Sequence, residues 1–468
     1  MGKMQINAQS DLYPLPEQAC KKDKWKAAIP ALYMMGSTSL MGIYISNFLS
    51  IFAAELNSVP YLAIMSLVYT LGVSTAAPIG GYLGDAYGRR NMALMSCAVL
   101  VAGIMLAARA SSLPAFLLGL ALWGIANGFD ETFYNGMLCD IFQGKDRTFF
   151  LGVANSFNAG AIMLSSVVSG YLMKTLRPQV VLAIAGSTIV VGWLLLFIFG
   201  KNIKTNVAAA KFDWKGSVFL IVALGAICTL LSAGGKYVPW ISLESLLLTA
   251  AAIGGMICLF YSYKKSENPI IDFRLFRIKY FLPVIFLVSF NKLQGPITVY
   301  IMSYANLVLK YSTSQLGNTQ FLTLIPVAIS PLIAKWLAES KKFTVSFLIS
   351  GILLTMQGLL MYVFITPETP YYVFVALRGL GNLATVFVMG PSIAFVATFI
   401  PKERRGVCLG LYTTIAYVAT ALLNSLGGLI YNFYNADIEI AFPKIALICG
   451  VLAIGSIFIT VKYMRNPT

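Results

Sequence analysis

The sequence predicts an all-α polytopic membrane protein with fourteen transmembrane helices, arranged as two six-helix halves with two inserted helices between them. Three observations predict this class: the composition, the spacing of the apolar runs, and an internal repeat. Of the 468 residues, 58% are hydrophobic and only 11% are charged, and the mean hydropathy is +0.78. Such a composition is far too apolar for an ordinary soluble domain.

Apolar runs of about 20 residues, the length that crosses roughly 30 Å of hydrocarbon, supply the predicted helices. With the N-terminus in the cytoplasm, most Lys and Arg residues fall on the cytoplasmic side, as the positive-inside rule requires. The net charge of +16 is then explained by membrane orientation, and no nucleic-acid binding is expected. The runs centre near Leu40, Leu71, Val101, Ala126, Ala161, Ile189, Ala223, Ala252, Asn291, Ile325, Leu354, Val386, Tyr417 and Val451.

An internal repeat relates the two halves at an offset of 258 residues (405 − 147 = 258). It pairs Arg147, Leu151, Gly152 and Gly170 with Arg405, Leu409, Gly410 and Gly428. Transporters are often built from such repeated halves. The predicted organisation is a cytoplasmic N-terminal segment (1–26), a first six-helix half (27–200), an inserted helix pair with a cytoplasmic connector (201–279), and a second six-helix half (280–468).

The segment Gly81-Tyr-Leu-Gly-Asp-Ala-Tyr-Gly-Arg-Arg90 forms the predicted turn between the second and third helices. Its glycines allow close approach of helix ends and a turn at positive φ. Asp85 can pair with a guanidinium or a helix N-terminus, and the two arginines hold the turn on the cytoplasmic side. We expect Gly81, Asp85, Gly88, Arg89 and Arg90 to form a cytoplasmic gate.

This turn resembles the G-x-L-x-D-x-x-G-R-R signature of the major facilitator superfamily, which implies a secondary transporter with a gated pathway. The later segment Pro269-Ile-Ile-Asp-Phe-Arg-Leu-Phe-Arg277 resembles the P-L-L-D-L-x-L-F-R segment of its fourteen-helix drug:proton antiporter branch. The outer loop Lys310–Gly317 is also similar to that branch.

Three coupling positions of that branch differ in this sequence. Leu120 stands where the branch has an arginine, although its repeat partner is Arg378. Met41 replaces an aspartate, and Ser165-Ser166 replaces a Gly-Pro pair. These differences suit a symporter, a uniporter or an exchanger as well as an exporter with altered coupling.

Four ionisable residues fall inside predicted helices: Asp130, Glu131, Lys292 and Arg378. Each such charge costs about 2.5 to 3.5 kcal/mol on insertion scales, so it usually faces a cavity. Adjacent helical residues point about 100° apart, so one of the two carboxylates is expected to face the pathway and the other a neighbouring helix.

The sequence therefore predicts substrate binding by Lys292, Arg378, Asn291, Gln294 and Tyr304. Because the chain has no histidine, proton coupling must use carboxylates or lysine, and Asp130 and Glu131 are the candidates. The alternative is structural, in which one of these carboxylates only neutralises Lys292 or Arg378.

The predicted function is secondary active transport of a small amphipathic or anionic organic solute by alternating access, coupled to an ion, with the proton as the expected ion. We expect a monomer in the cell membrane with both termini in the cytoplasm. Two alternatives stay open: multidrug efflux by proton antiport, and a membrane solute sensor that does not transport. The seven cysteines show no CxxC spacing and no phosphate-binding loop occurs, so no enzyme activity, metal site or cofactor is expected.

Overall fold

The computed structural model describes residues 21–142, 144–200, 213–266, 269–328, 342–399 and 405–464. Within these ranges, the side chains of some helical residues, Asp85 and Glu131 among them, fall outside the description. The regular elements of these ranges are helices, and one isolated bridge joins Gly234 to Val238. The all-α class predicted from the sequence is confirmed.

The first half contains six long helices, with one short helix and a 3-10 turn between the first two. These elements are α1 (Lys21–Asn47), α2 (Leu49–Glu55), η1 (Val59–Tyr61), α3 (Leu62–Tyr87), α4 (Arg89–Arg109), α5 (Leu113–Ile141), α6 (Gly144–Leu172) and α7 (Pro178–Phe199).

An inserted pair, α8 (Trp214–Ala233) and α9 (Leu243–Lys265), and the 3-10 helix η2 (Phe273–Arg277) lead to the second half. That half contains α10 (Phe281–Asn291), α11 (Gln294–Leu307), α12 (Thr313–Ala328), α14 (Phe343–Phe364), α15 (Tyr371–Phe399), α16 (Arg405–Phe433) and α17 (Ile438–Tyr463).

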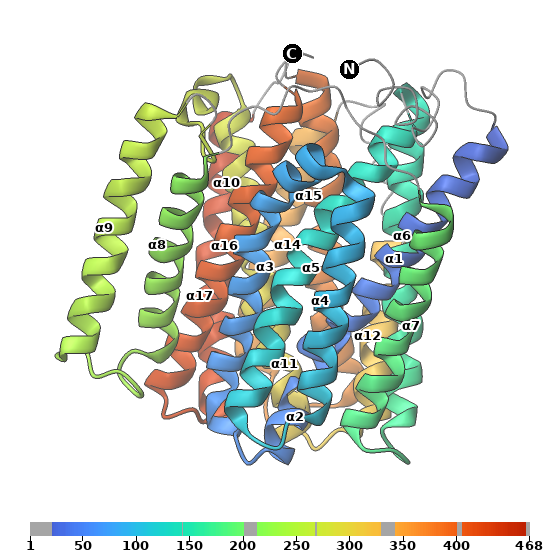
Figure 1. The fold of residues 1–468 in the computed structure, drawn as a ribbon. Coiled ribbons are helices and arrows are strands. Elements are labelled where there is room, and N and C mark those ends of the chain that lie inside the picture. Colours follow the sequence, from blue (N-terminus) through green and yellow to red (C-terminus); the bar gives the residue numbers. More distant parts are fainter. Residues whose placement is uncertain are drawn as a thin grey trace, which may run out of the picture.

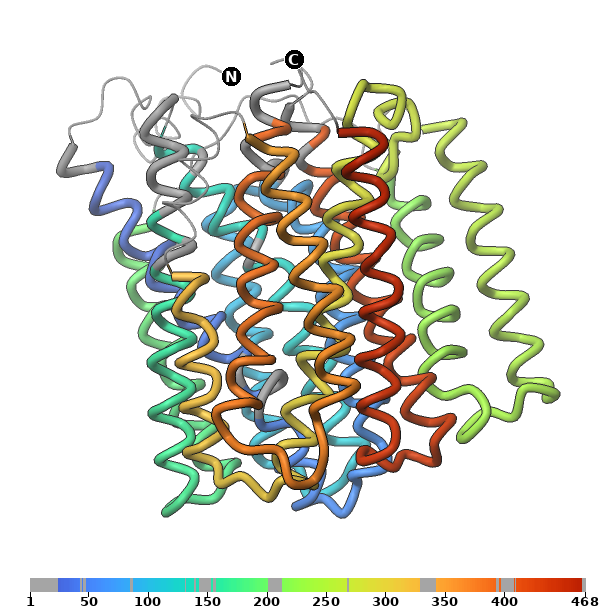
Figure 2. Tube along the Cα trace, turned by 180° about the vertical axis from the view of Figure 1, so that it is seen from behind, coloured from blue at the N-terminus to red at the C-terminus, as the bar shows by residue number. Residues whose placement is uncertain are grey.

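The long helices run side by side, and α1 begins at the same end of the bundle at which α17 ends (Figures 1 and 2). We call this end the terminus end and the opposite one the distal end. The inserted pair lies at the edge of the bundle, with α9 outermost (Figure 1). Only 22% of the most apolar window of α9 is buried, so this helix offers its apolar side chains to lipid.

Eleven helical spans among the described residues are long and apolar enough to cross a membrane, with α10 and α11 counted as one span. Close packing of the helices depends on small residues, as is usual in membrane bundles. In the pair α14 and α17, a Cβ at Gly358 would lie 2.5 Å from Gly450 Cα. A side chain at either position would push the two helices apart.

Candidate functional site

The predicted helix through Asn291 is broken where the sequence places its candidate substrate residues. α10 ends at Asn291 and α11 begins at Gln294. Pro296 explains the break, because a proline ring clashes with the carbonyl group four residues earlier in a continuous helix. That carbonyl, on Lys292, instead accepts a hydrogen bond from Gly295 N at 2.9 Å. Lys292 and Leu293 keep a right-handed helical backbone, so the break is a tight turn within one span.

Arg378 of α15 is buried inside the second half, with 2% of its surface exposed. Its Nη2 donates to Gln320 Oε1 of α12, and its backbone carbonyl accepts a hydrogen bond from Gln357 Nε2 of α14 at 3.4 Å. Within the described part of the chain, Arg378 Nε has no hydrogen-bond partner and no Asp or Glu forms an ion pair with the guanidinium. Among the described residues, the guanidinium therefore has an unused donor and no counter-charge.

Two amide side chains meet one helical turn from Arg378. A Cβ at Gly381 would collide with both Gln294 of α11 and Gln357 of α14. Neither amide atom of Gln294, nor Gln357 Oε1, has a hydrogen-bond partner among the residues described. Buried polar atoms without partners are costly, so these amide groups are candidates to bind a polar group of a solute. The second-half polar cluster consists of Gln294, Gln320, Gln357 and Arg378.

The other predicted substrate residues lie in different settings. Asn291 is buried one turn before Gln294, and its Nδ2 has no partner among the described residues. Lys292, at the helix break itself, is partly exposed. Tyr304 is ten residues beyond Gln294, about 15 Å along the helix axis, and its ring packs against Phe442 of α17 with centroids 5.4 Å apart. Tyr304 therefore does not join the polar cluster.

Asp130 of α5 lies inside the first half and is completely buried. The side chains of Ser96 and Tyr134 are its nearest polar neighbours, but Ser96 Oγ donates to Ala126 O at 3.1 Å and Tyr134 Oη pairs with Cys97 Sγ at 3.1 Å. No described group forms a hydrogen bond of normal geometry with either carboxylate oxygen. Since Ser96 and Cys97 belong to α4, the side chain of Asp130 faces a neighbouring helix. The side chain of Glu131 lies outside the described residues.

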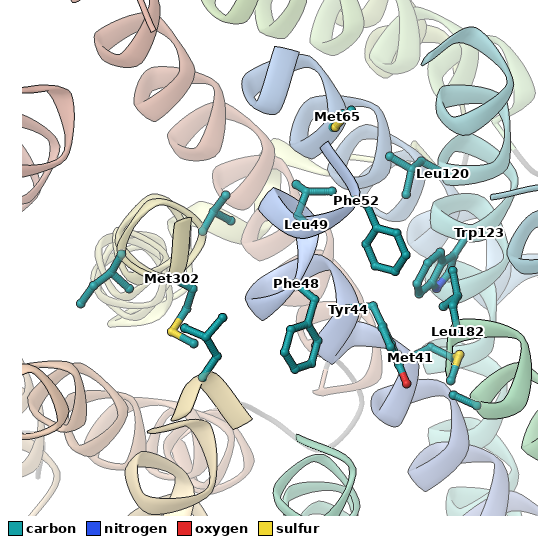
Figure 3. Close-up of a cluster of buried hydrophobic side chains, with 14 of the residues drawn as sticks. Met41, Tyr44, Phe48, Leu49, Phe52, Met65, Leu120, Trp123, Leu182 and Met302 are labelled. Carbon is teal, nitrogen blue, oxygen red and sulfur yellow. The ribbon is translucent and has the colours of Figure 1, made fainter. Parts of the chain in front are cut away.

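Met41 and Leu120, which replace the charged residues of the antiporter branch, both lie in a buried apolar cluster (Figure 3). Both side chains are 0% exposed. The cluster also contains Phe52 and Trp123, both labelled in Figure 3. The surroundings that could have held a charge pair in the first half are thus filled with hydrocarbon and aromatic rings.

The two arginines of the turn between α3 and α4 bind the ends of other first-half helices. Arg89 Nη1 lies 3.1 Å from Asp140 Oδ2 near the end of α5. Arg90 Nε and Nη2 donate to the carbonyls of Leu196 and Phe197 at the end of α7, at 3.3 and 2.7 Å. Cations at helix C-termini are favourable because the helix dipole is negative there. Both arginines therefore fasten the terminus end of the first half.

The glycines of this turn differ in their surroundings. Gly88 has φ of 89°, so the predicted positive-φ turn is confirmed. A Cβ at Gly84 would meet Arg89 Cγ at 2.9 Å, whereas one at Gly81 would meet no described atom within 4 Å. The side chain of Asp85 lies outside the described residues.

The halves contact each other where α6 packs against α12 and α3 against α16, and two hydrogen bonds join them at the distal end. Thr313 Oγ1 donates to Gly170 O at 2.7 Å, and Tyr431 Oη donates to Val59 O at 3.3 Å. Toward the terminus end, a Cβ at Gly410 of α16 would meet no described atom within 4 Å. The structure is thus closed at its distal end.

Long apolar helices, a buried polar cluster beside a broken helix, and two halves that meet at one end define a membrane transporter built from two related parts. The chain belongs to the Major Facilitator Superfamily, whose model matches residues 31–318 and 282–468. Members of this family are transporters and not enzymes, and the family predicted from the Gly81–Arg90 segment is confirmed.

Similar proteins include bacterial drug transporters. The multidrug transporter protein MdtP of Bacillus subtilis is 23% identical over 79% of this chain and 68% of its own length. The quinolone resistance protein NorB of Staphylococcus aureus is 26% identical over 80% of this chain and 79% of its own length. The efflux pump dotC of Dothistroma septosporum is longer, and this chain spans 46% of it.

Solved transporter structures share the fold. A POT family transporter in complex with a thioalcohol conjugated peptide has a TM-score of 0.69 at 13% identity, covering 97% of this chain and 98% of its own. The human organic anion transporter MFSD10 has a TM-score of 0.63 at 14% identity, covering 93% and 99%. At this level of identity the similarity concerns the fold.

Proposed function

We propose that the chain carries a small amphipathic or anionic organic solute across the cell membrane by alternating access. In this proposal fourteen helical segments cross the bilayer. Eleven of these are the apolar spans, and the other three are α1, α6 and α12, which run along the same bundle (Figure 1). The polar residues of these three helices support a role in lining the pathway. The closed distal end and the absence of described neighbours around Gly81 and Gly410 support a conformation that admits solute from the terminus end.

The buried guanidinium of Arg378 carries the proposal for the solute. A buried charge without a counter-charge is strongly unfavourable, and the described neighbours of Arg378 are neutral amides. A carboxylate or similar anion would accept from the unused Nε and from the amide of Gln294, and it would balance the charge. Lys292 and Asn291, at the adjacent helix break, extend this region. Tyr304 stays a predicted substrate residue without a contact to the cluster.

Proton coupling is proposed for the carboxylates of the first half. Asp130 offers a buried carboxyl group beside the hydroxyl of Tyr134 and the thiol of Cys97, and Glu131 is the neighbouring candidate. Separation of the acid in the first half from Arg378 in the second suits a cycle in which proton and anion act on different halves.

Uptake into proteoliposomes tests this function. The purified chain would be reconstituted and supplied with radiolabelled amphipathic carboxylates and with their neutral amides, with and without an imposed pH gradient. We expect accumulation of carboxylates that depends on the gradient, and little accumulation of the amides. Gradient-independent leakage of both series would refute the proposal.

Multidrug efflux is the second candidate, and the names of the relatives favour it, since they include a multidrug transporter and a quinolone resistance protein. In that case expression in drug-sensitised cells should raise resistance to quinolones or cationic dyes. Unchanged drug sensitivity across such a panel, together with carboxylate uptake, would contradict multidrug efflux and support anion transport.

Orientation and assembly are also proposed. Basic side chains near the terminus end, such as Arg89, Arg90, Lys264 and Lys265, support a cytoplasmic location of both termini. Gly81, Asp85, Gly88, Arg89 and Arg90 would then act as the cytoplasmic gate of a monomer.

A further inference from the structure

The inserted helix pair lies at the edge of the bundle (Figure 1) and contacts both halves through α8. α8 packs against α3 of the first half and against α16 of the second. At the distal end, a Cβ at Gly428 of α16 would meet Ser232 Oγ of α8 at 3.1 Å and Ala63 Cβ of α3 at 3.2 Å. Three parts of the chain therefore meet at one point of the closed distal end.

The loop between α8 and α9 binds the first half through Tyr237. Its Oη donates to Pro60 O at 2.7 Å, and its ring stacks on Tyr61 with centroids 4.9 Å apart. Burial, with the nearby Tyr61, raises the pKa of Tyr237 to about 12. The phenol therefore keeps its proton at physiological pH and remains a donor.

The residue before it binds the second half. Lys236 Nζ donates to Asn435 O at 3.0 Å, just beyond the C-terminus of α16, where a cation is favoured by the helix dipole. The same helix end donates from Asn432 Nδ2 to the backbone carbonyl of Ser232. Its geometry is fixed by a Schellman turn, with Ala436 N bound to Tyr431 O at 2.9 Å.

The backbone of the loop fixes the positions of Lys236 and Tyr237. Gly235 adopts φ of 81°, and its N–H donates to Val238 O at 2.9 Å. Tyr237 N donates to Ala233 O at 2.9 Å, which ties the turn to the end of α8. Because Lys236 and Tyr237 are adjacent in a fixed turn, the loop cannot follow both halves if they separate.

We infer that the inserted pair is a distal lock: Ser232 at the end of α8, and Lys236 and Tyr237 of the loop after it, clamp the start of α3 to the end of α16 and hold the distal end closed. This inference rests on alternating access as proposed above, because opening the distal end then requires one side of the lock to break. The insertion would thus set the balance between the two access states without touching the solute.

Hydrogen exchange of the backbone amides tests the lock in lipid nanodiscs, without any solute. Tyr237→Phe removes the bond to Pro60, and Lys236→Met removes the bond to Asn435 while keeping an apolar stem. Loss of one ordinary hydrogen bond should shift the opening equilibrium about fivefold. Exchange in residues 59–64 and 428–436 should rise by about that factor in either single variant and further in the double variant.

Ser242→Ala is the matched control, since Ser242 caps α9 inside the insertion by accepting from Ser245 N at 3.2 Å. It should raise exchange only at the start of α9. The lock is refuted if the double variant leaves both segments unchanged, or if Ser242→Ala raises them equally. Failure of carboxylate uptake with a positive exchange result would instead count against the proposed solute.

Discussion

α5 and α15 occupy equivalent places in the two halves, yet they carry opposite kinds of buried charge. Each has 29 residues, and α15 begins 258 residues after α5 (371 − 113 = 258). At the same offset, Leu120 corresponds to Arg378, and Asp130 corresponds to Val388. Asp130 of the first half is thus matched by an apolar residue, whereas apolar Leu120 is matched by the buried base Arg378 with its amide neighbour Gln320.

This difference shows that a repeated fold can assign its two halves different chemistry. Val388 packs with Phe395 in an apolar cluster, so the second half has no counterpart of the buried acid at that position. Leu120 lies in the cluster of Figure 3, so the first half cannot hold a guanidinium there without rearrangement. Under the proposed function, the solute anion and the coupling proton would therefore bind in different halves.

Placing an arginine in the first half should produce the largest effect. Leu120→Arg buries an unpaired cation among aromatic and aliphatic groups, and we expect a loss of about 3 kcal/mol or more in unfolding free energy. Thermal unfolding can be followed with a thiol-reactive dye, because Cys97, Cys408 and Cys449 are buried. Leu120→Met is the control and should unfold within a few degrees of the wild type. An equally stable arginine variant would show that the first half accommodates the charge.

Removing the arginine of the second half should affect the solute. Arg378→Gln loses a charge-assisted contact, which should weaken carboxylate binding about 10- to 100-fold. Equilibrium binding of the best carboxylate from the uptake panel would measure it. Lys444→Gln is the control, because it removes a positive charge from a partly exposed second-half lysine beside Tyr362. Equal losses in both variants would point to general electrostatics instead of a site.

Neutralising the buried acid of the first half should separate coupling from binding. Asp130→Asn should abolish gradient-driven accumulation, which for one proton is at most about tenfold per pH unit, while solute exchange at equal pH continues. Thr132→Val is the matched α5 control, since its hydroxyl donates to Phe129 O at 2.7 Å in its own turn. Full accumulation by Asp130→Asn would remove this residue from the coupling role and leave Glu131.

Sequence reasoning reached the fold class and family because these depend on composition and on short motifs. The gate turn was recognisable from its glycines and arginines, and the positive φ of Gly88 follows from the residue type. Arg378 was recognisable because a charge within an apolar run is rare.

Other features depended on packing between distant segments. Gln320 and Gln357 were missed as partners of Arg378, although glutamines inside apolar runs are a usable signal. The break at Lys292 was also missed, and Pro296 was its signal. Asp130 faces α4 because of the rotation of α5 about its own axis, and the local sequence around Asp130 does not determine that rotation.

The terminus end of the first half gives the last and smallest expected effect. Asp140→Asn removes the ion-pair partner of Arg89; the side chains of Arg89 and Asp140 are 21% and 13% exposed. Such a pair stabilises by about 1 kcal/mol. The turn between α3 and α4 should therefore open about fivefold more often. Hydrogen exchange at Met92, whose N–H donates to Gly88 O, would report it. Asp272→Asn breaks the exposed pair with Arg274 in the connector and should leave this exchange unchanged. If Asp140→Asn also leaves the exchange at Met92 unchanged, the ion pair between Arg89 and Asp140 does not stabilise the turn of the first half.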